Sequence, residues 1–451
     1  MTYETTTGRE GTDGPGRARG RRTTPPQRTV LISGASVAGP ALAYWLGRYG
    51  FRSTVIEVAP ALRGGGFAVD FRGAAQLTVL KRMGVLADIT SHSTGGGTPL
   101  TFIDGQGRPI AALPAEFAGG EVEILRSELS RILHRHSLSP LDPSHTLGNP
   151  PEYLFGDSVS SLTQTADGVQ VTFERGASRT FDLVIGADGL HSTVRRLAFG
   201  PETDFVRHLG YYVAAWDLPE GAGDLGARPV GYGEPGRLAT VGRTHRRTEE
   251  PGYTGESFCV FASEEELLHD RRDLRPQKQA IARAYAGAGW RTPELIDTLG
   301  AVGDLYFDSI SRVDVPHWST GRIALLGDAA YGATVGGMGT GAAIIGAYVL
   351  AGELALAEGD HRTAFARYEH ALRPYVTRCQ EGGRGAGEFL APVTQEAMDA
   401  RNAALNTPAA VAAMLQQGHD ISAAITPEDY PSLVAAAATA PANGGSPIRT
   451  G

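Results

Sequence analysis

The sequence has little cysteine, no excess of basic charge and no long apolar run. Its two cysteines, Cys259 and Cys379, lie outside any Cys-x-x-Cys or Cys/His pattern, which excludes a disulfide framework and favours a reducing, cytoplasmic setting. With 41 basic against 49 acidic residues the net charge is −8, so no nucleic-acid or membrane partner is expected. No run reaches the roughly 20 apolar residues of a membrane span. His134 and His136 point different ways on a helix, and no metal site is expected.

Glycine, in contrast, is abundant, at 60 of 451 residues or about twice the usual share. It gathers in four clusters, at residues 34–39, 64–66, 186–189 and 336–341. Because glycine accepts positive φ and lets a ligand approach the backbone, clusters that follow strands indicate a large bound cofactor. Flexible linker fits only the two ends of the chain. We therefore expect a small-molecule partner, bound by a monomer or a homodimer.

The first folded segment has the pattern of a β-α-β unit. Residues 1–27 are rich in Gly, Arg, Thr and Pro, and we expect them to be disordered. Residues 29–33 are an apolar β run, residues 40–50 have helical apolar spacing, and residues 51–58 form a second strand. A right-handed crossover makes these two strands parallel neighbours.

Later segments change character twice. Extended, aromatic-bearing runs at about residues 211–216, 237–241 and 257–261 predict a separate sheet. The α/β pattern returns with an apolar strand at residues 322–326, and two helices are expected at about residues 341–356 and 363–379. The sheet is therefore expected to be inserted between two halves of one α/β domain.

The strongest motif is the glycine turn that joins the first strand to the first helix. Residues Gly34 to Gly39 have the placement of a dinucleotide-binding turn, in which helix N–H groups and the helix dipole bind a pyrophosphate. Glu57 ends the next strand 18 residues after Gly39, where an acidic residue binds the ribose of an unphosphorylated dinucleotide. Ser36 stands where a second glycine is usual. A tight structural turn without a ligand stays open as the alternative.

Three motifs in this order resemble those of the class A FAD-dependent monooxygenases, which have the p-hydroxybenzoate hydroxylase fold and include the tetracycline-inactivating monooxygenases. They are the glycine turn, then Gly186-Ala187-Asp188-Gly189 with Ser192 and Arg195, then Gly327-Asp328-Ala329-Ala330. The resemblance covers about residues 28–378 and implies non-covalent FAD, with a solvated helix charge as the alternative role for Arg126. The implied cofactor contacts are Gly34, Ser36, Val37, Ala38, Gly39, Glu57, Val58, Arg63, Gly65, Arg126, Asp188, Gly327, Asp328, Gly337, Gly339 and Thr340.

The predicted fold class is α/β, with a Rossmann-like FAD-binding domain, an inserted, mainly antiparallel substrate sheet and a C-terminal helical segment. The FAD-binding domain takes residues 28–100, 121–200 and 301–378, and the substrate domain takes residues 101–120 and 201–300. Helices fill residues 379–435, and residues 436–451 are expected to be a disordered tail. The substrate pocket is expected between the FAD site and the inserted sheet. Alternation along the strands and nearness to the flavin motifs select Phe67, Val69, Tyr212, Ala214, Trp216, Leu238, Thr240 and Met338.

The resemblance implies a hydroxylase that uses NAD(P)H and O₂ and oxidises a bulky hydrophobic or polycyclic molecule through a flavin C4a-hydroperoxide, in natural-product biosynthesis or antibiotic inactivation. Many relatives have His after the Gly-Asp-Ala-Ala stretch and a nearby Pro, where this chain has Tyr331 and a run without Pro. A redox-neutral cyclase of the 4+2 type in polyketide biosynthesis, with FAD in a structural role, stays open as an alternative. So does a flavin-binding protein without catalysis.

Overall fold

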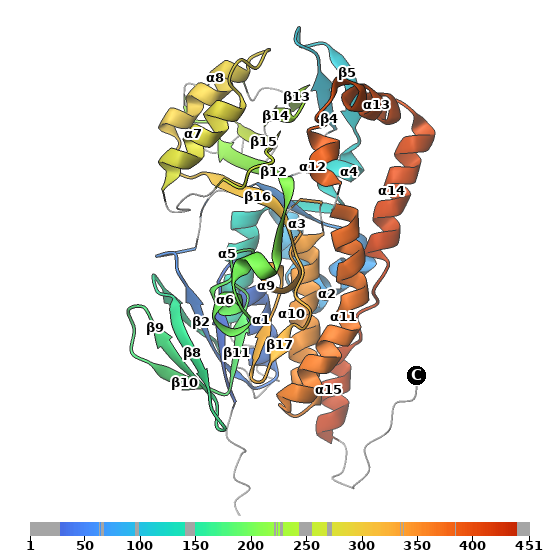
Figure 1. Cartoon of the computed structure of the whole chain (residues 1–451). Helices are drawn as coiled ribbons and strands as arrows, with labels where there is room; N and C mark the ends of the chain where they lie inside the picture. The colour runs from blue at the N-terminus through green and yellow to red at the C-terminus, as the bar shows by residue number, and fades with distance from the viewer. Residues whose placement is uncertain are drawn as a thin grey trace, which may run out of the picture.

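The computed structural model describes residues 28–62, 64, 67–94, 99–139, 149–220, 222, 224–225, 229–242, 255–267, 273–333, 335–336, 338–383 and 385–439. The tail expected at residues 1–27 lies outside these residues, as do residues 440–451 of the tail expected at 436–451 and Arg63, Gly65 and Gly337. An α/β part forms the lower half in Figure 1, and a part built on a second sheet forms the upper half.

A six-stranded sheet in the order β17-β18-β11-β1-β2-β7 organises the lower half. The first two strands are parallel neighbours, as the β-α-β pattern predicts, and only the edge strand β17 runs antiparallel to its neighbour. The carboxyl ends of the parallel strands therefore meet at one edge, where ligands bind in such sheets. The strand bounds are β1 (Thr29–Ser33), β2 (Arg52–Glu57), β7 (Glu152–Phe155), β11 (Leu183–Gly186), β17 (Ser319–Thr320) and β18 (Ile323–Leu325).

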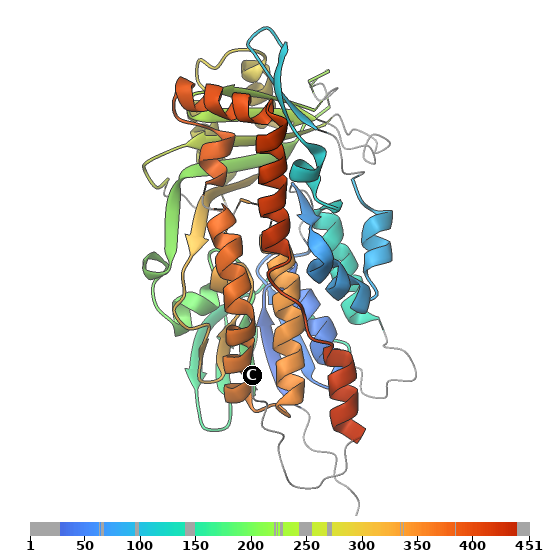
Figure 2. The same ribbon diagram turned by 90° about the vertical axis from the view of Figure 1, so that its right-hand side faces the viewer.

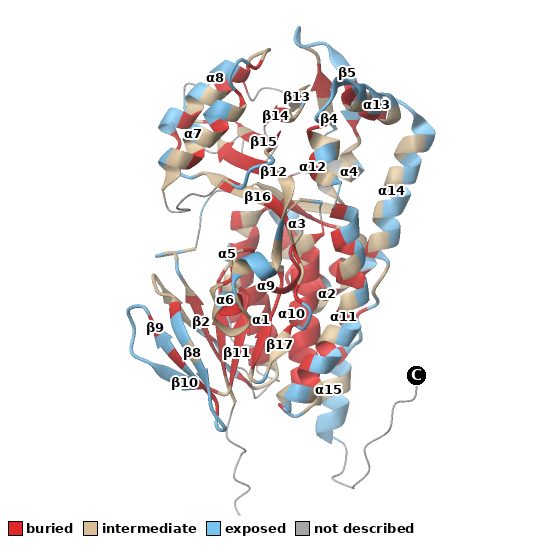
Figure 3. Ribbon diagram, viewed as in Figure 1, coloured by how far each residue is buried: buried red, intermediate tan, exposed pale blue. Residues whose placement is uncertain are grey.

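The long helix α10 (Gly339–Leu356) is the centre of the lower core. Its sequence is apolar all round, which is typical of a helix that is covered on every side. It is long and apolar enough to cross a membrane, but 78% of it is buried inside the protein, so it is a core helix (Figure 3). The helices packed against it are α1 (Ala38–Arg48), α2 (Gly73–Arg82), α11 (His361–Gly383) and α15 (Tyr430–Thr439).

Smaller elements surround this core. Two antiparallel sheets, β10-β9-β8 and β3-β6, contribute short strands, and the hairpin expected around Asp167-Gly168 is confirmed as β8–β9. The bounds are β3 (Ala68–Phe71), β6 (Val122–Leu125), β8 (Val159–Gln164), β9 (Val169–Phe173), β10 (Arg179–Phe181), α3 (Leu86–Ser91), α4 (Ala115–Gly119), α5 (Arg126–Leu138), α6 (Thr193–Ala198), η1 (Glu202–Asp204) and α9 (Asp328–Tyr331).

A seven-stranded sheet in the order β16-β12-β15-β14-β13-β4-β5 organises the upper half. It is antiparallel except for the β13–β4 pair. The sequence placed residues 301–378 in the other domain, but β16 (Tyr306–Val313) is hydrogen-bonded to β12 in this sheet, because its alternating side chains complete the same two faces. The other strands are β4 (Leu100–Ile103), β5 (Pro109–Leu113), β12 (Val206–Asp217), β13 (Val230–Glu234), β14 (Arg237–Gly242) and β15 (Glu256–Ala262).

Helices cover both faces of the upper sheet. On one side α7 (Leu274–Ala284), α8 (Thr292–Asp297) and η3 (Thr298–Ala301) build a separate apolar core with the sheet. On the other side lie α12 (Ala386–Leu390) and α13 (Gln395–Leu405). The helix α14 (Pro408–Ser422) then runs alongside both halves of the molecule (Figures 1 and 2).

The final helix corrects one prediction. Residues 436–439, expected in a disordered tail, continue α15 to Thr439. Tyr430 anchors this helix, because its buried ring lies over Gly352 of α10 and its hydroxyl donates to Glu353 over 2.7 Å.

Candidate active site

Two glycines shape the turn between β1 and α1. Gly34 has a φ of +107°, and a Cβ there would lie 2.4 Å from the carbonyl oxygen of Ala187. A Cβ on Gly39 would lie 1.9 Å from the carbonyl oxygen of Gly34. Within the described chain, the residue before α1, Val37, makes no side-chain capping bond to the helix N-terminus. Such an N-terminus suits a phosphate, because its N–H groups and the helix dipole both favour an anion.

Glu57 is held beside this turn by backbone groups. Its Oε2 accepts the Ala35 N–H over 2.9 Å, and its Oε1 accepts the Ala59 N–H over 3.0 Å. The next side chain, Val58, is 42% exposed. The Glu57 carboxylate is therefore fixed beside the turn between β1 and α1, and Val58 follows it at the end of β2.

Arg126, at the start of α5, reaches the same turn. Its Nη2 donates to Ser36 Oγ over 3.3 Å, so the guanidinium points into the protein and not into bulk solvent. Asp328, at the start of α9, is close enough to be influenced by it: burial raises the pKa of the Asp328 carboxyl, and the Arg126 charge opposes that rise. Gly339, the first residue of α10, also lies against Asp328. Side chains from separate motifs thus meet at one edge of the sheet.

Asp188 is bound entirely by neighbouring protein groups in this region. Its carboxylate accepts from Ser33 Oγ over 3.1 Å, from the Val194 N–H over 3.1 Å and from Ser192 Oγ. Burial raises its pKa, and these hydrogen bonds oppose the rise. Asp188 therefore links the end of β1 to the start of α6 by hydrogen bonds. These bonds hold the strand end from which the Gly34 turn begins.

Arg195 joins two of the motifs directly. Its side chain is fully buried, and Nη1 donates to the carbonyl oxygen of Ala329 over 3.0 Å. It also donates to the carbonyl oxygen of Leu190 and lies 3.6 Å from Glu202. The segment around residue 188 and the segment around residue 328 are thereby fixed to each other.

Two residues near α10 face the core. Tyr331 is buried with its ring against Trp318, its hydroxyl accepts a hydrogen bond from the Tyr368 hydroxyl over 3.4 Å, and the same hydroxyl lies against Gly346 of α10. Met338, predicted to line the substrate pocket, is buried in the lower core, with its sulfur 3.9 Å from Gln76 Nε2. The Tyr331 side chain is therefore accommodated by packing against the neighbouring helices.

Comparison with known proteins decides the family. The chain is 36% identical over 359 residues to a flavin-dependent monooxygenase of Legionella longbeachae, an alignment that covers 78% of this chain and 87% of that protein. The chain belongs to the flavin-dependent monooxygenases.

Further matches agree with this membership. A model described as an FAD binding domain matches residues 27–219. An uncharacterised protein of Mycobacterium tuberculosis is 41% identical over 363 residues, covering 78% of this chain and 92% of that protein. The crystal structure of tetracycline destructase Tet(51) is similar with a TM-score of 0.74 and 30% identity, covering 90% of this chain and all of that one. FAD is therefore the cofactor of this monooxygenase, and the glycine turn lies within the part of the chain that matches the FAD binding domain.

In this monooxygenase, the face of the upper sheet that is turned toward the FAD-binding part is not the face predicted from the strand pattern. Tyr212, Ala214 and Trp216 of β12 are buried in the core formed with α7 and α8, which faces away from the FAD-binding part. Strand side chains alternate between faces, so a one-residue offset placed the wrong set in the pocket. Leu238 and Thr240 of β14 do lie on the opposite face, whereas Val69 is in the lower core.

Three aromatic rings meet where this face approaches the lower half. Phe67 lies between the two parts, with its ring centroid 5.9 Å from that of Phe258 and 4.9 Å from that of Tyr306. Its carbonyl oxygen accepts the Arg126 N–H, so the rings adjoin the cofactor-side residues. Phe258 and Tyr306 escaped the sequence analysis, because strand alternation alone does not say which face meets the cofactor.

Proposed function

We propose that this monooxygenase uses NAD(P)H and O₂ to oxidise a bulky, mainly hydrophobic and polycyclic small molecule, held between FAD and the upper sheet. The observation that carries this proposal is the make-up of the sheet face beside Phe67. Register pairs Tyr306 with Ala215, Ala215 with Phe258, and Phe258 with Thr240. Rings therefore alternate with small side chains along one row.

That row favours a flat apolar ligand. The Thr240 hydroxyl donates to the Phe258 carbonyl oxygen over 2.9 Å, so its polarity is already satisfied within the sheet. Aromatic side chains prefer offset or edge-to-face partners, so this row would favour a planar, apolar ring system as its partner. The charged groups near this row, Arg126, Asp308 and Asp328, lie toward the cofactor side.

We assign the residues that would hold FAD from the family resemblance, and the side chains gathered at the sheet edge support that assignment. The N-terminus of α1 would bind the pyrophosphate, Glu57 the adenosine ribose, and Asp328 the ribityl chain, with Arg126 between the turn and the flavin. When bound, FAD would supply the redox chemistry that a monooxygenase needs. The protein then orients the substrate and excludes water. Because both cysteines are free and buried, we place the enzyme in a reducing cytoplasm.

The test is product analysis with a panel of polycyclic phenols that includes tetracycline, the substrate named for the Tet(51) relative. The protein, loaded with FAD, is incubated with each compound with and without NADPH, and oxygen uptake and product mass are measured. A monooxygenase gives a product heavier by one oxygen atom, and only when NADPH is present. An isomer of unchanged mass, formed without NADPH, would instead identify a cyclase.

A matched pair of variants tests the proposed substrate face. Phe258→Leu alters the row beside Phe67, whereas Phe261→Leu alters the opposite face of the same strand, in the core with α7 and α8. We expect Phe258→Leu to change substrate preference at nearly unchanged stability. Phe261→Leu should lower stability and leave preference unchanged. The reverse pattern would place the substrate elsewhere.

A further inference from the structure

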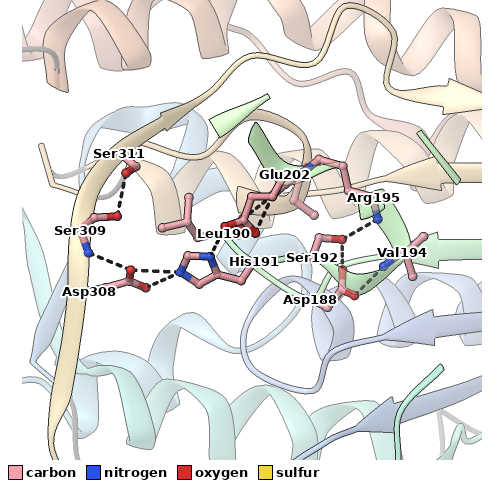
Figure 4. Close-up of polar contacts among 11 residues, drawn as sticks. Asp188, Leu190, His191, Ser192, Val194, Arg195, Glu202, Asp308, Ser309 and Ser311 are labelled. Atoms are coloured by element: carbon pink, nitrogen blue, oxygen red, sulfur yellow. Dashed lines mark hydrogen bonds and ion pairs between the residues drawn. The ribbon is translucent and has the colours of Figure 1, made fainter. Parts of the chain in front are cut away.

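A histidine joins the two halves of the molecule. His191 lies in the loop between β11 and α6, and both of its ring nitrogens face carboxylates (Figure 4). Nδ1 is 2.9 Å from Glu202 Oε1 in η1 of the lower half. Nε2 is 3.0 Å and 3.2 Å from the two carboxylate oxygens of Asp308, which belongs to β16 of the upper sheet. One imidazole ring therefore bridges the FAD-binding part and the substrate sheet.

The chemistry of the ring sets its protonation state. A neutral imidazole has one N–H donor and one bare nitrogen, whereas an ionised carboxylate only accepts. A neutral His191 would therefore place a lone pair against a carboxylate oxygen at one of its two contacts. An imidazolium donates at both. The cluster is satisfied only when it holds one proton more than a neutral ring and two carboxylates.

The neighbouring charges favour His191 as the site of that proton. Glu202 also faces the buried Arg195 guanidinium at 3.6 Å, which favours the ionised form of Glu202. Arg195 in turn lies within the electrostatic reach of Asp188. On the upper side, Asp308 lies near Tyr306 and Asp328. Burial raises the pKa of both groups, and the negative charge of Asp308 raises it as well.

We propose that His191 is held as an imidazolium that pins the substrate sheet to the FAD-binding part and so fixes Asp308 beside the cofactor site. His191 is a positioning residue, since it acts through Asp308. Its position at the junction supports this role. Next to it, β12 and β16 cross between the halves, and the N–H groups of Val313 and Asp314 bond to the carbonyl oxygens of Gly332 and Phe205 over 2.9 Å and 2.8 Å.

Hydrogen exchange at this junction is the test, measured by mass spectrometry on peptides that contain Val313 and Asp314. His191→Gln keeps a polar side chain but cannot donate to both carboxylates. We expect exchange at the junction to rise about tenfold or more, since a hydrogen bond to a charged group is lost. His136→Gln is the matched control. His136 of α5 also bonds a carboxylate, that of Asp88 in α3, over 2.6 Å, but both of these helices belong to the lower half. Equal protection in the two variants would overturn the proposal.

A second arm tests the protonation directly and needs no loss of the ring. In the unmodified holoenzyme, exchange at the junction, corrected for the intrinsic rate, should rise as pH is raised and the imidazolium loses its proton. In Asp308→Asn the amide N–H can donate to the bare Nε2 while Nδ1–H donates to Glu202. This variant should therefore keep its junction protected at high pH. At high pH it should also retain more FAD after gel filtration than the unmodified protein does. Two results would contradict the proposal: exchange at the junction that does not change with pH in the unmodified protein, or exchange in Asp308→Asn that rises with pH as it does in the unmodified protein.

Discussion

Gly39→Ala is the change that most sharply separates the FAD-binding turn from an ordinary structural turn. The new Cβ would lie 1.9 Å from the Gly34 carbonyl oxygen, well under the 3.0 Å that real Cβ contacts respect, and 3.3 Å from Ile32 Cγ2. Because the clash is with backbone, the N-terminus of α1 has to move by about 1 Å. Overpacking of this kind costs about 3 kcal/mol, which lowers the melting temperature of a chain of this length by roughly 3 °C.

The same movement displaces the helix N–H groups from the pyrophosphate. Loss of one such charge-assisted bond weakens FAD binding by roughly tenfold or more. FAD content after gel filtration and FAD titration by fluorescence measure this, alongside thermal unfolding. Gly418→Ala in α14 is the matched control, since nothing lies within 4 Å of its added methyl group and alanine favours a helix by up to about 1 kcal/mol. A Gly39→Ala protein with full FAD and an unchanged melting temperature would refute the reasoning.

The remaining predictions concern buried and cofactor-side groups. Arg126→Met should weaken FAD binding by roughly tenfold while leaving the melting temperature of the FAD-free protein nearly unchanged, and equal FAD affinity would show that the guanidinium does not reach the cofactor. Arg195→Met removes the bonds to Leu190 and Ala329 from a buried site, and should destabilise the protein by about 3 kcal/mol in denaturant unfolding; a loss below about 1 kcal/mol would contradict that role. Burial raises the pKa of Cys259 to about 11 and that of Cys379 to about 12, so a thiol reagent at pH 8 should modify neither in the native protein and both after unfolding.

The local elements around the glycine turn could be predicted because their signals are short-range. An apolar run, a glycine turn and an acidic residue at the end of the next strand lie within residues 29–57, and the structure forms β1, α1 and β2 from them. The proximity of Ser36, Arg126 and Asp328 was expected only through family resemblance, since they are far apart in the chain.

The substrate face could not be predicted because it depends on which side of a sheet each helix covers. In β12 both faces are apolar: Tyr212 and Trp216 pack under α7 and α8, and Val213 packs on the other side. The sequence alone carries no sign of which set meets FAD. The same limit applies to His191, whose partners come from η1 and from β16, and only the folded chain brings all three together.

The central claim, that this chain transfers oxygen to a polycyclic substrate, is tested most directly with isotopic oxygen. The FAD-loaded protein is given NADPH, ¹⁸O₂ and the polycyclic phenol panel, and products are weighed. The account predicts a product that carries one ¹⁸O atom, formed only with NADPH and with matching oxygen uptake. An isomeric product without ¹⁸O, or bound FAD that NADPH never reduces with any compound of the panel, would contradict it.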